Sequence, residues 1–306
     1  MNKKGFTLVE LIGVVVILGL IALVAFPSLL NQINNSNKQI SDSQKDLIIA
    51  ATKNYVEENK NEYANKNFFV VDVDVLAEKN YIDKKLIKSY TDEKNKLLVT
   101  ALNGEYNVTV SKGNAKCEAV TSLTISGAGS VPTASNPFVY GAEYKCFVNE
   151  KESNQFYVLD ENEDTVMLIM NKTFKDSITN WCKGNNNNNC GAVTAKEVLA
   201  NKTKDWEVGT VLPDRNILVK ANNGSTGQAA SWMVTNFSDA SANYWTSTPS
   251  PYNGGVNYAY VIHRNGMSLN NSHQVGTYKD NGEKINLTYG IRPVIIVSKE
   301  IITYPQ

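Results

Sequence analysis

The sequence predicts an α+β protein in which a long N-terminal helix packs on a small antiparallel sheet and a second α+β domain follows. Three observations support this class. An uncharged apolar run leads into residues at helical spacing, a hairpin pattern follows at residues 97–110, and further strand and helix patterns fill the second half. The length of 306 residues agrees with two domains.

The composition is that of a globular protein without a dominant charge. Hydrophobic residues make up 42% and charged residues 20%. Lys plus Arg equal Asp plus Glu at 30 each, so the formal net charge is zero. Because no basic excess is present, we expect no nucleic acid among the partners.

The N-terminal segment is the most informative part of the chain. An uncharged run extends from Leu11 to Leu30. As a helix with 1.5 Å rise per residue it spans about 30 Å, the thickness of the hydrocarbon core of a bilayer. Lys3 and Lys4 precede the run. They predict a single-pass segment in the cytoplasmic membrane, with the N-terminus in the cytoplasm and the rest of the chain exported.

Glu10 separates the roles that this segment can have. A secretory signal peptide has a shorter apolar core and a small-residue cleavage site, for which Ala25-Phe26-Pro27 is a poor match. A carboxylate at the edge of an apolar span costs free energy, and such residues are functional by default. The alternative is structural, because Thr7-Leu-Val-Glu10 also fits a capping box in which Glu10 accepts from a backbone N–H.

These residues resemble the N-terminus of the type IV pilin and pseudopilin family. The match consists of Lys3-Lys4-Gly5, Phe6-Thr7-Leu8-Val9-Glu10-Leu11-Ile12, and Pro27 within the apolar helix. The resemblance implies that a prepilin peptidase cuts after Gly5 and that Phe6 becomes the N-methylated first residue. It also implies that Glu10 pairs with the free amine of a neighbouring subunit during assembly, and that Pro27 marks a kink.

Electrostatics support the role that the resemblance implies for Glu10. Cleavage creates an α-amine with a pKa of about 7.7–8.0, which is charged at neutral pH and lies near lipid. A carboxylate within one helical turn is the obvious partner for that amine, and the positive end of a helix also favours an anion.

Beyond the apolar run the pattern predicts that the helix continues into a globular part. Apolar residues recur there at helical spacing. They are Ile33, Ile40, Leu47, Ala51 and Tyr55. A strand at Phe68–Val71, a short helix at Val73–Tyr81, and a hairpin formed by 97–102 and 106–110 around Asn103-Gly104 then follow. A long helix with a small antiparallel sheet resembles the pilin globular fold.

Four cysteines lie in the second half, namely Cys117, Cys146, Cys182 and Cys190. The chain has no C-x-x-C pair and only 2 histidines, so we expect neither a metal site nor a cofactor. An even number of cysteines in an exported chain predicts two disulfides, with three pairings open. Closure of the Asn-rich loop between Cys182 and Cys190 is the simplest choice and leaves Cys117 with Cys146. Four free buried thiols are the alternative.

The second half predicts a separate α+β domain. The expected boundaries are a leader at 1–5, the transmembrane part of the helix at 6–30, a pilin globular domain at 31–115, a linker or arm at 116–139, and the second domain at 140–306. Its expected elements are a hairpin of 155–160 and 165–170, a helix opened by a Thr194-Ala-Lys-Glu197 capping box, a helix at 227–237, and strands at 244–248, 256–264, 267–275 and 290–298.

Two segments of this domain resemble C-type-lectin-like domains of the formylglycine-generating-enzyme branch. They are Tyr244-Trp-Thr-Ser-Thr-Pro249 and Gly290-Ile-Arg-Pro-Val-Ile295, and the similarity extends loosely over 140–300. An unrelated α+β domain with a Trp-rich core is the alternative. The family's catalytic cysteines have no counterpart after Cys190, and no catalytic set or phosphate loop is visible, so we expect no enzyme. The calcium-dependent lectin motifs are also missing, so sugar binding is not implied.

A binding surface is expected at the hairpin of 256–275 and its approaches. Polar and aromatic residues suited to a carbohydrate or protein ligand gather there. They are Tyr252, Tyr258, Tyr260, His263, Asn270 and Asn271. Because residues of a strand alternate between its faces, some of these aromatic side chains are equally consistent with a core position.

The sequence thus predicts a minor type IV pilin that displays a lectin-like adhesion domain on an extracellular filament at the cell surface. Its expected partners are the prepilin peptidase, other pilin subunits, the membrane before assembly, and a host or surface carbohydrate or protein. One alternative is a pseudopilin of a type II secretion or DNA-uptake machine. A second is a membrane-anchored surface binding protein or enzyme that does not polymerise.

Overall fold

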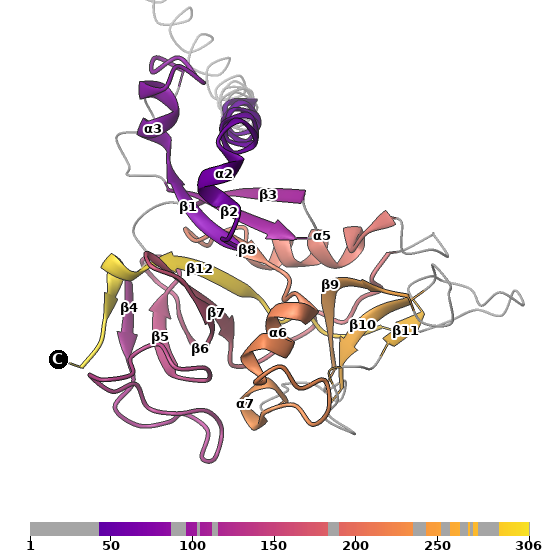
Figure 1. The fold of residues 1–306 in the computed structure, drawn as a ribbon. Helices are drawn as coiled ribbons and strands as arrows, with labels where there is room; N and C mark the ends of the chain where they lie inside the picture. The colour runs from indigo at the N-terminus through magenta and orange to yellow at the C-terminus, as the bar shows by residue number, and fades with distance from the viewer. Residues whose placement is uncertain are drawn as a thin grey trace, which may run out of the picture.

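The computed structural model describes residues 43–86, 96–102, 105–111, 116–182, 190–234, 243–251, 258–263, 269, 272–274 and 288–305. These residues form a mixed α+β protein with three sheets (Figure 1), which confirms the predicted class. Within the described ranges, no helix is long and apolar enough to cross a membrane. The expected apolar span at 6–30 lies outside them.

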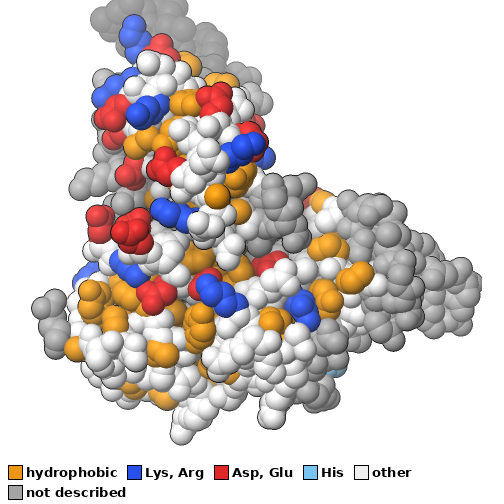
Figure 2. Space-filling view, in the orientation of Figure 1, with side chains coloured by type: hydrophobic (Ala, Val, Ile, Leu, Met, Phe, Trp, Pro, Cys, Tyr) orange, Lys and Arg blue, Asp and Glu red, His pale blue; other side chains and the backbone are white. Residues whose placement is uncertain are grey.

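The first unit is a helix packed on a three-stranded antiparallel sheet. The helix covers residues 43–58 in the described part. The remaining elements are α2 (Lys60–Tyr63), β1 (Phe68–Asp72), α3 (Val73–Glu78), β2 (Lys96–Leu102) and β3 (Glu105–Ser111), with the strand order β1-β2-β3. The predicted strand, short helix and hairpin are present. On the face shown in Figure 2, acidic and basic side chains of this unit are interspersed.

The face of the first helix that contacts the sheet differs in part from the predicted stripe. Ala51 and Tyr55 are buried as expected, but Leu47 is 51% exposed and Ile48 is fully buried in its place. Ile48 lies three positions before Ala51 and seven before Tyr55, so it shares their face of a helix with 3.6 residues per turn. Ile33 and Ile40 lie outside the described residues.

The second unit contains a seven-stranded sheet and a smaller three-stranded sheet. The larger sheet has the order β13-β4-β5-β6-β7-β12-β8 and the smaller one the order β11-β10-β9. The strands are β4 (Lys116–Ala119), β5 (Glu143–Phe147), β6 (Ser153–Glu161), β7 (Thr165–Met170), β8 (Thr210–Val211), β9 (Tyr244–Ser250), β10 (Tyr258–Ile262), β11 (Ser272–Gln274), β12 (Val294–Ser298) and β13 (Ile302–Thr303). The helices are α5 (Val193–Lys202), α6 (Arg215–Ala221) and α7 (Ser231–Val234), with a 3₁₀ turn at Lys299–Ile301.

The central strands of the large sheet are buried on both faces. In β7, Met167 and Ile169 belong to one buried cluster, whereas Val166 and Leu168 belong to another. Since side chains of a strand alternate between its faces, a strand covered on both sides is apolar along its whole length. This explains the continuous apolar sequences of β7 and β12.

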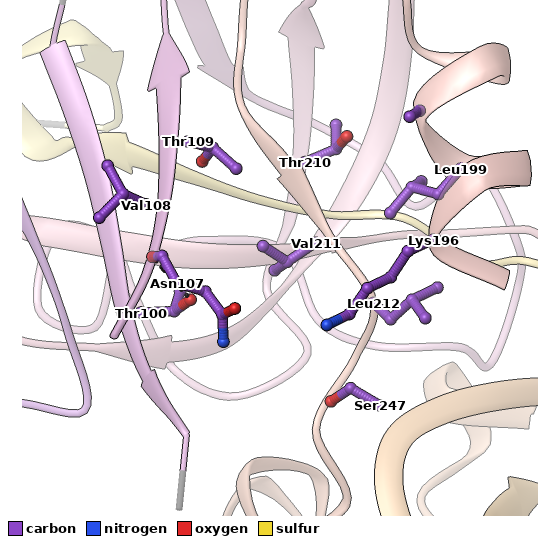
Figure 3. A pocket seen from close by; sticks show the side chains of 11 residues that line it. Thr100, Asn107, Val108, Thr109, Lys196, Leu199, Thr210, Val211, Leu212 and Ser247 are labelled. Carbon is purple, nitrogen blue, oxygen red and sulfur yellow. Dashed lines mark hydrogen bonds between the residues drawn. The ribbon is translucent and has the colours of Figure 1, made fainter. Parts of the chain in front are cut away.

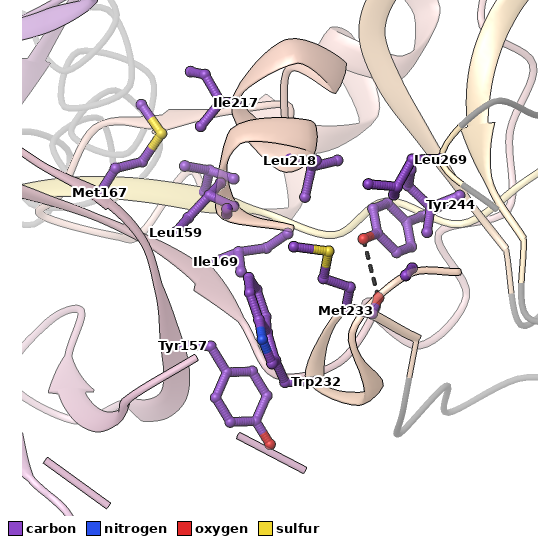
Figure 4. Close-up of a cluster of buried hydrophobic side chains, with 14 of the residues drawn as sticks. Tyr157, Leu159, Met167, Ile169, Ile217, Leu218, Trp232, Met233, Tyr244 and Leu269 are labelled. Atoms are coloured by element: carbon purple, nitrogen blue, oxygen red, sulfur yellow. Dashed lines mark hydrogen bonds between the residues drawn. The ribbon is translucent and has the colours of Figure 1, made fainter. Parts of the chain in front are cut away.

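Helices α6 and α7 cover one face of this sheet. Figure 4 shows Leu218 of α6 and Trp232 of α7 packed over Ile169 of β7. The hydroxyl of Tyr244, at the start of β9, donates to the backbone oxygen of Met233 at 3.0 Å. The same cluster therefore connects the large sheet, the helices and the small sheet.

The two units share a packed seam rather than a flexible connection. Phe68 of β1 is 2% exposed and belongs to the same buried cluster as Met167 and Ile217 of the second unit. The side-chain amide of Asn162 donates to the backbone oxygen of Phe68 at 2.7 Å. Neighbouring Phe69 points to the opposite face of the strand and is buried against the first helix. The sheet of the first unit is thus covered by the helix on one side and by the second unit on the other.

Alanine at these two neighbouring positions is expected to affect different parts of the molecule. Each change removes a buried phenyl ring and lowers the free energy of unfolding by about 3–5 kcal/mol. Phe68→Ala is expected to speed amide hydrogen exchange in β7 and α6, and Phe69→Ala in the helix at 43–58. Exchange that rises in the same segments in both variants would contradict the assignment of the two faces.

Several expected elements differ from the structure. The predicted linker at 116–139 begins with strand β4, which pairs with β5. The capping box is wrong, because α5 begins at Val193 after Ala192, and Thr194 lies inside the helix. The helix ends at Lys202, so Trp206 follows its end.

The helix expected at 227–237 begins later than predicted, as α7, because the residues before α7 form a loop. The side-chain amide of Asn222 donates to the backbone oxygens of Ser225 and Gln228 and accepts from the N–H of Ala230. These bonds satisfy backbone groups that a helix would otherwise pair internally.

Candidate functional site

The predicted binding residues are only partly described. Tyr252, Asn270 and Asn271 lie outside the described residues. Tyr258 and Tyr260 are half-buried in β10, where they alternate with the fully buried Ala259 and Val261. Both tyrosines therefore lie on the face of β10 opposite to Ala259 and Val261, the face that also carries the buried Ile262.

Arg215, at the start of α6, forms a polar and aromatic group with Tyr260. Its guanidinium carbon lies 4.4 Å from the centre of the Tyr260 ring, and its Nε donates to the backbone oxygen of Leu269 at 3.0 Å. A cation at this distance from a ring is attracted by the negative face of the ring. The pair therefore combines an aromatic ring with a cationic side chain.

The buried carboxylate of Asp214 holds Arg215 in place. It accepts from the N–H groups of Asn216 and Ile217 at 2.8 and 3.2 Å and so caps α6. Its second oxygen accepts from the Thr248 hydroxyl of β9 at 2.6 Å. The helix start is thereby fixed to the small sheet.

His263 follows β10 directly and is half-buried. Its Nε2 lies 2.8 Å from Nδ2 of Asn243, and its ring centre lies 6.1 Å from that of Tyr289. In the part of the chain that the structure describes, no group of three or more His, Cys, Asp or Glu side chains could hold a metal ion. His263 therefore contacts other protein groups, and its proposed ligand role stays a prediction.

Arg292 lies at the centre of the predicted lectin-like strand but is fully buried. Its guanidinium donates to the backbone oxygens of Met170, Trp232 and Met233. It also lies 5.3 Å from the ring centre of Tyr244. Burial lowers the pKa of Arg292, because the charged form loses its hydration, and the neighbouring Tyr244 opposes this change. Arg292 connects α7 to β7 and is not positioned to contact a ligand.

The structure contains two disulfides, Cys117–Cys146 and Cys182–Cys190. This is the pairing favoured from the sequence, and every cysteine is used. Cys117 and Cys146 are opposite each other on the paired strands β4 and β5. The first disulfide therefore joins β4, the strand that follows the first unit in the sequence, to the neighbouring strand β5 of the large sheet. The second closes the Asn-rich loop, which lies outside the described residues.

The assembly residues implied by the pilin resemblance, Gly5, Phe6, Glu10 and Pro27, also lie outside the described residues. Residues 1–26 match the family model described as a prokaryotic N-terminal methylation motif. The match covers Gly5, Phe6 and Glu10, and Pro27 follows its last residue. It supports a type IV pilin-like prepilin N-terminus, which implies processing by a prepilin peptidase and assembly with other pilins.

No curated protein and no solved structure matches the chain. The resemblance of residues 140–300 to C-type-lectin-like domains is therefore not supported by these comparisons.

Proposed function

We propose that this chain is a minor type IV pilin subunit that enters an extracellular filament and displays its second unit as an adhesion module. The match of residues 1–26 to the N-terminal methylation motif carries this proposal. The helix at 43–58 packed on the β1-β2-β3 sheet supports it, since a long helix on a small antiparallel sheet is the arrangement expected of a pilin domain.

The packed seam supports a role in display. An adhesion module must keep its direction relative to the filament and must transmit force to it. The shared cluster around Phe68, together with the hydrogen bond from Asn162, gives the second unit a fixed orientation on the pilin domain. A unit of this size on every subunit would crowd a helical filament, so we assign the chain to sparse positions or to the tip.

We place the binding surface of the module on the face of β10 that carries Tyr258 and Tyr260. Both tyrosines are half-buried there and Arg215 stacks on Tyr260, so aromatic and cationic groups are close together. The proposed ligand is a carbohydrate or a polar protein segment on a host or another surface. In this proposal the chain acts by assembly and binding, without catalysis.

Mass spectrometry of the N-terminal peptide from sheared surface filaments tests the assembly part of this proposal. We expect a chain that begins at N-methylated Phe6 and is found in the filament fraction. A processed chain that never appears in surface filaments would instead assign it to a pseudopilin of a secretion or DNA-uptake machine. A chain that still begins at Met1 and is found only in membranes would contradict both roles.

A further inference from the structure

A cleft of about 220 Å³ lies at the seam between the two units (Figure 3). Strands β2 and β3 of the first unit line one side, and α5 and β8 of the second unit line the other. The residues that line the cleft do not include Arg215, Tyr258 or Tyr260, which we propose for adhesion.

The walls of the cleft are mostly apolar. Val108 of β3 is 9% exposed, Leu199 of α5 is 3% exposed, and Leu212 after β8 is 2% exposed. Thr100 and Val211 also line the cleft. A concave apolar surface with few polar groups is the usual character of a small-molecule site.

Two hydrogen-bond donors lie at the mouth of the cleft and come from different units. Figure 3 shows the Lys196 side chain extending from α5 and the Asn107 side chain extending from β3 toward the same gap. Among the residues that the structure describes, no carboxylate forms an ion pair with Lys196. A cationic amine beside an amide, above an apolar wall, is complementary to an anion with an apolar body.

We propose that this cleft binds a small amphipathic carboxylate. The apolar body of the ligand packs against Val108, Leu199 and Leu212. Its carboxylate accepts hydrogen bonds from Nζ of Lys196 and from the side-chain amide of Asn107. Because the two donors belong to different units, the bound ligand also connects the units across the seam.

Two kinds of molecule have the chemistry of this ligand. One is a free aliphatic acid, and the other is a peptide that ends in an apolar residue with a free C-terminal carboxylate. Both present an apolar group next to a carboxylate. The proposal does not depend on filament assembly, so its outcome is independent of the N-terminal processing test.

Isothermal titration calorimetry on the full chain in lipid nanodiscs tests the proposal. The probes are hexanoate, N-acetyl-leucyl-leucine and the neutral hexanol, each also titrated into empty nanodiscs. We expect saturable binding of a carboxylate probe and much weaker binding of hexanol. Tighter binding of hexanoate assigns a free acid, and tighter binding of the dipeptide assigns a peptide C-terminus.

Three variants locate the site. Lys196→Gln removes the charge and is expected to weaken carboxylate binding at least about tenfold. Ala200→Trp fills the cleft from its exposed edge on α5 and is expected to abolish binding. Lys204→Gln removes an exposed lysine that does not line the cleft, so it should bind as the unchanged chain does. A thermal melt on each variant verifies folding.

Three results would overturn the proposal. The first is heat no greater than that of empty nanodiscs. The second is binding that neither Lys196→Gln nor Ala200→Trp reduces, since the ligand would then lie elsewhere. The third is hexanol that binds as tightly as hexanoate, which would exclude recognition of a carboxylate.

Discussion

Replacing Glu10 with alanine is expected to reduce incorporation of this chain into filaments by at least tenfold. Processing after Gly5 leaves a charged amine on Phe6, four positions before Glu10. Without the carboxylate that amine has no charged partner when it leaves the lipid, and loss of one member of a buried charge pair costs about 2–5 kcal/mol. Every 1.4 kcal/mol corresponds to a factor of ten. Quantitative immunoblots of sheared filaments and of membranes measure the ratio.

Two further variants distinguish the effect of the Glu10 charge from that of its hydrogen bonding and from the effect of losing any exposed glutamate. Glu10→Gln keeps an acceptor but removes the charge, so an intermediate ratio is expected. Glu57→Ala removes an exposed glutamate whose partner Lys60 lies 3.6 Å away on the surface, and it should leave incorporation unchanged. Filaments that take up Glu10→Ala normally would support the alternative in which Glu10 only caps the helix.

The elements that the sequence predicted well depend on local patterns. The Asn103-Gly104 pair between two apolar runs predicts the β2–β3 hairpin, and the structure pairs Leu102 with Glu105 around it. The hairpin of β6 and β7 follows from two apolar runs separated by an acidic segment, and the structure pairs the two strands in antiparallel register. In both cases the residues that decide the structure lie within a few positions of each other.

Elements that depend on distant contacts escaped prediction. Strand β13 is only two residues long and pairs in parallel with β4, so the sequence around Ile302 contains no period to recognise. Helix α6 is short, but Asp214 after Pro213 is an N-cap residue that could have revealed it.

The candidate sites also differ in whether their residues are close together or far apart in the sequence. The N-terminal motif is contiguous, so the residues at 5, 6 and 10 could be predicted from sequence alone. The family match covers them, and their individual roles stay predictions. The seam cleft combines Asn107, Lys196 and Leu212 with residues near 247, which are far apart in the chain and belong to no motif. The sequence drew attention to the segment that contains Arg292. Its role in the core could be recognised only from the structure, which places carbonyl groups of α7 and β7 beside its guanidinium.

Arg292 is expected to be the position in the second unit that is least tolerant of substitution. Its one guanidinium satisfies backbone oxygens on two elements, Met170 at the end of β7 and Trp232 and Met233 in α7. Removing it leaves the oxygens of Met170 and Trp232 without this donor, whereas the oxygen of Met233 keeps the Tyr244 hydroxyl. An unsatisfied buried polar group costs about 1–3 kcal/mol. Arg292→Ala adds a cavity and is expected to lower the free energy of unfolding by at least about 4 kcal/mol, or to prevent folding.

Arg292→Met provides the sharper experiment, because methionine fills much of the same volume without supplying donors. The cavity then contributes little to the change. A remaining loss of about 3 kcal/mol in the free energy of unfolding, measured with urea, is therefore the cost of leaving the carbonyl groups without a donor. Arg215→Ala is the matched control. Arg215 is half-buried, and its Nε donates to the backbone oxygen of Leu269, so a loss of about 1 kcal/mol is expected.

The comparison of these variants decides what the buried arginine does. If Arg292→Met were as stable as the unchanged chain, the guanidinium would serve only to fill space, as replacements of buried ions by apolar residues sometimes show. A large loss in Arg292→Met combined with a small loss in Arg215→Ala would instead establish that the guanidinium stabilises the contact between α7 and the large sheet. Because the ring of Tyr244 packs beside the same guanidinium, that loss should also shift the near-UV circular dichroism of the aromatic side chains before global unfolding.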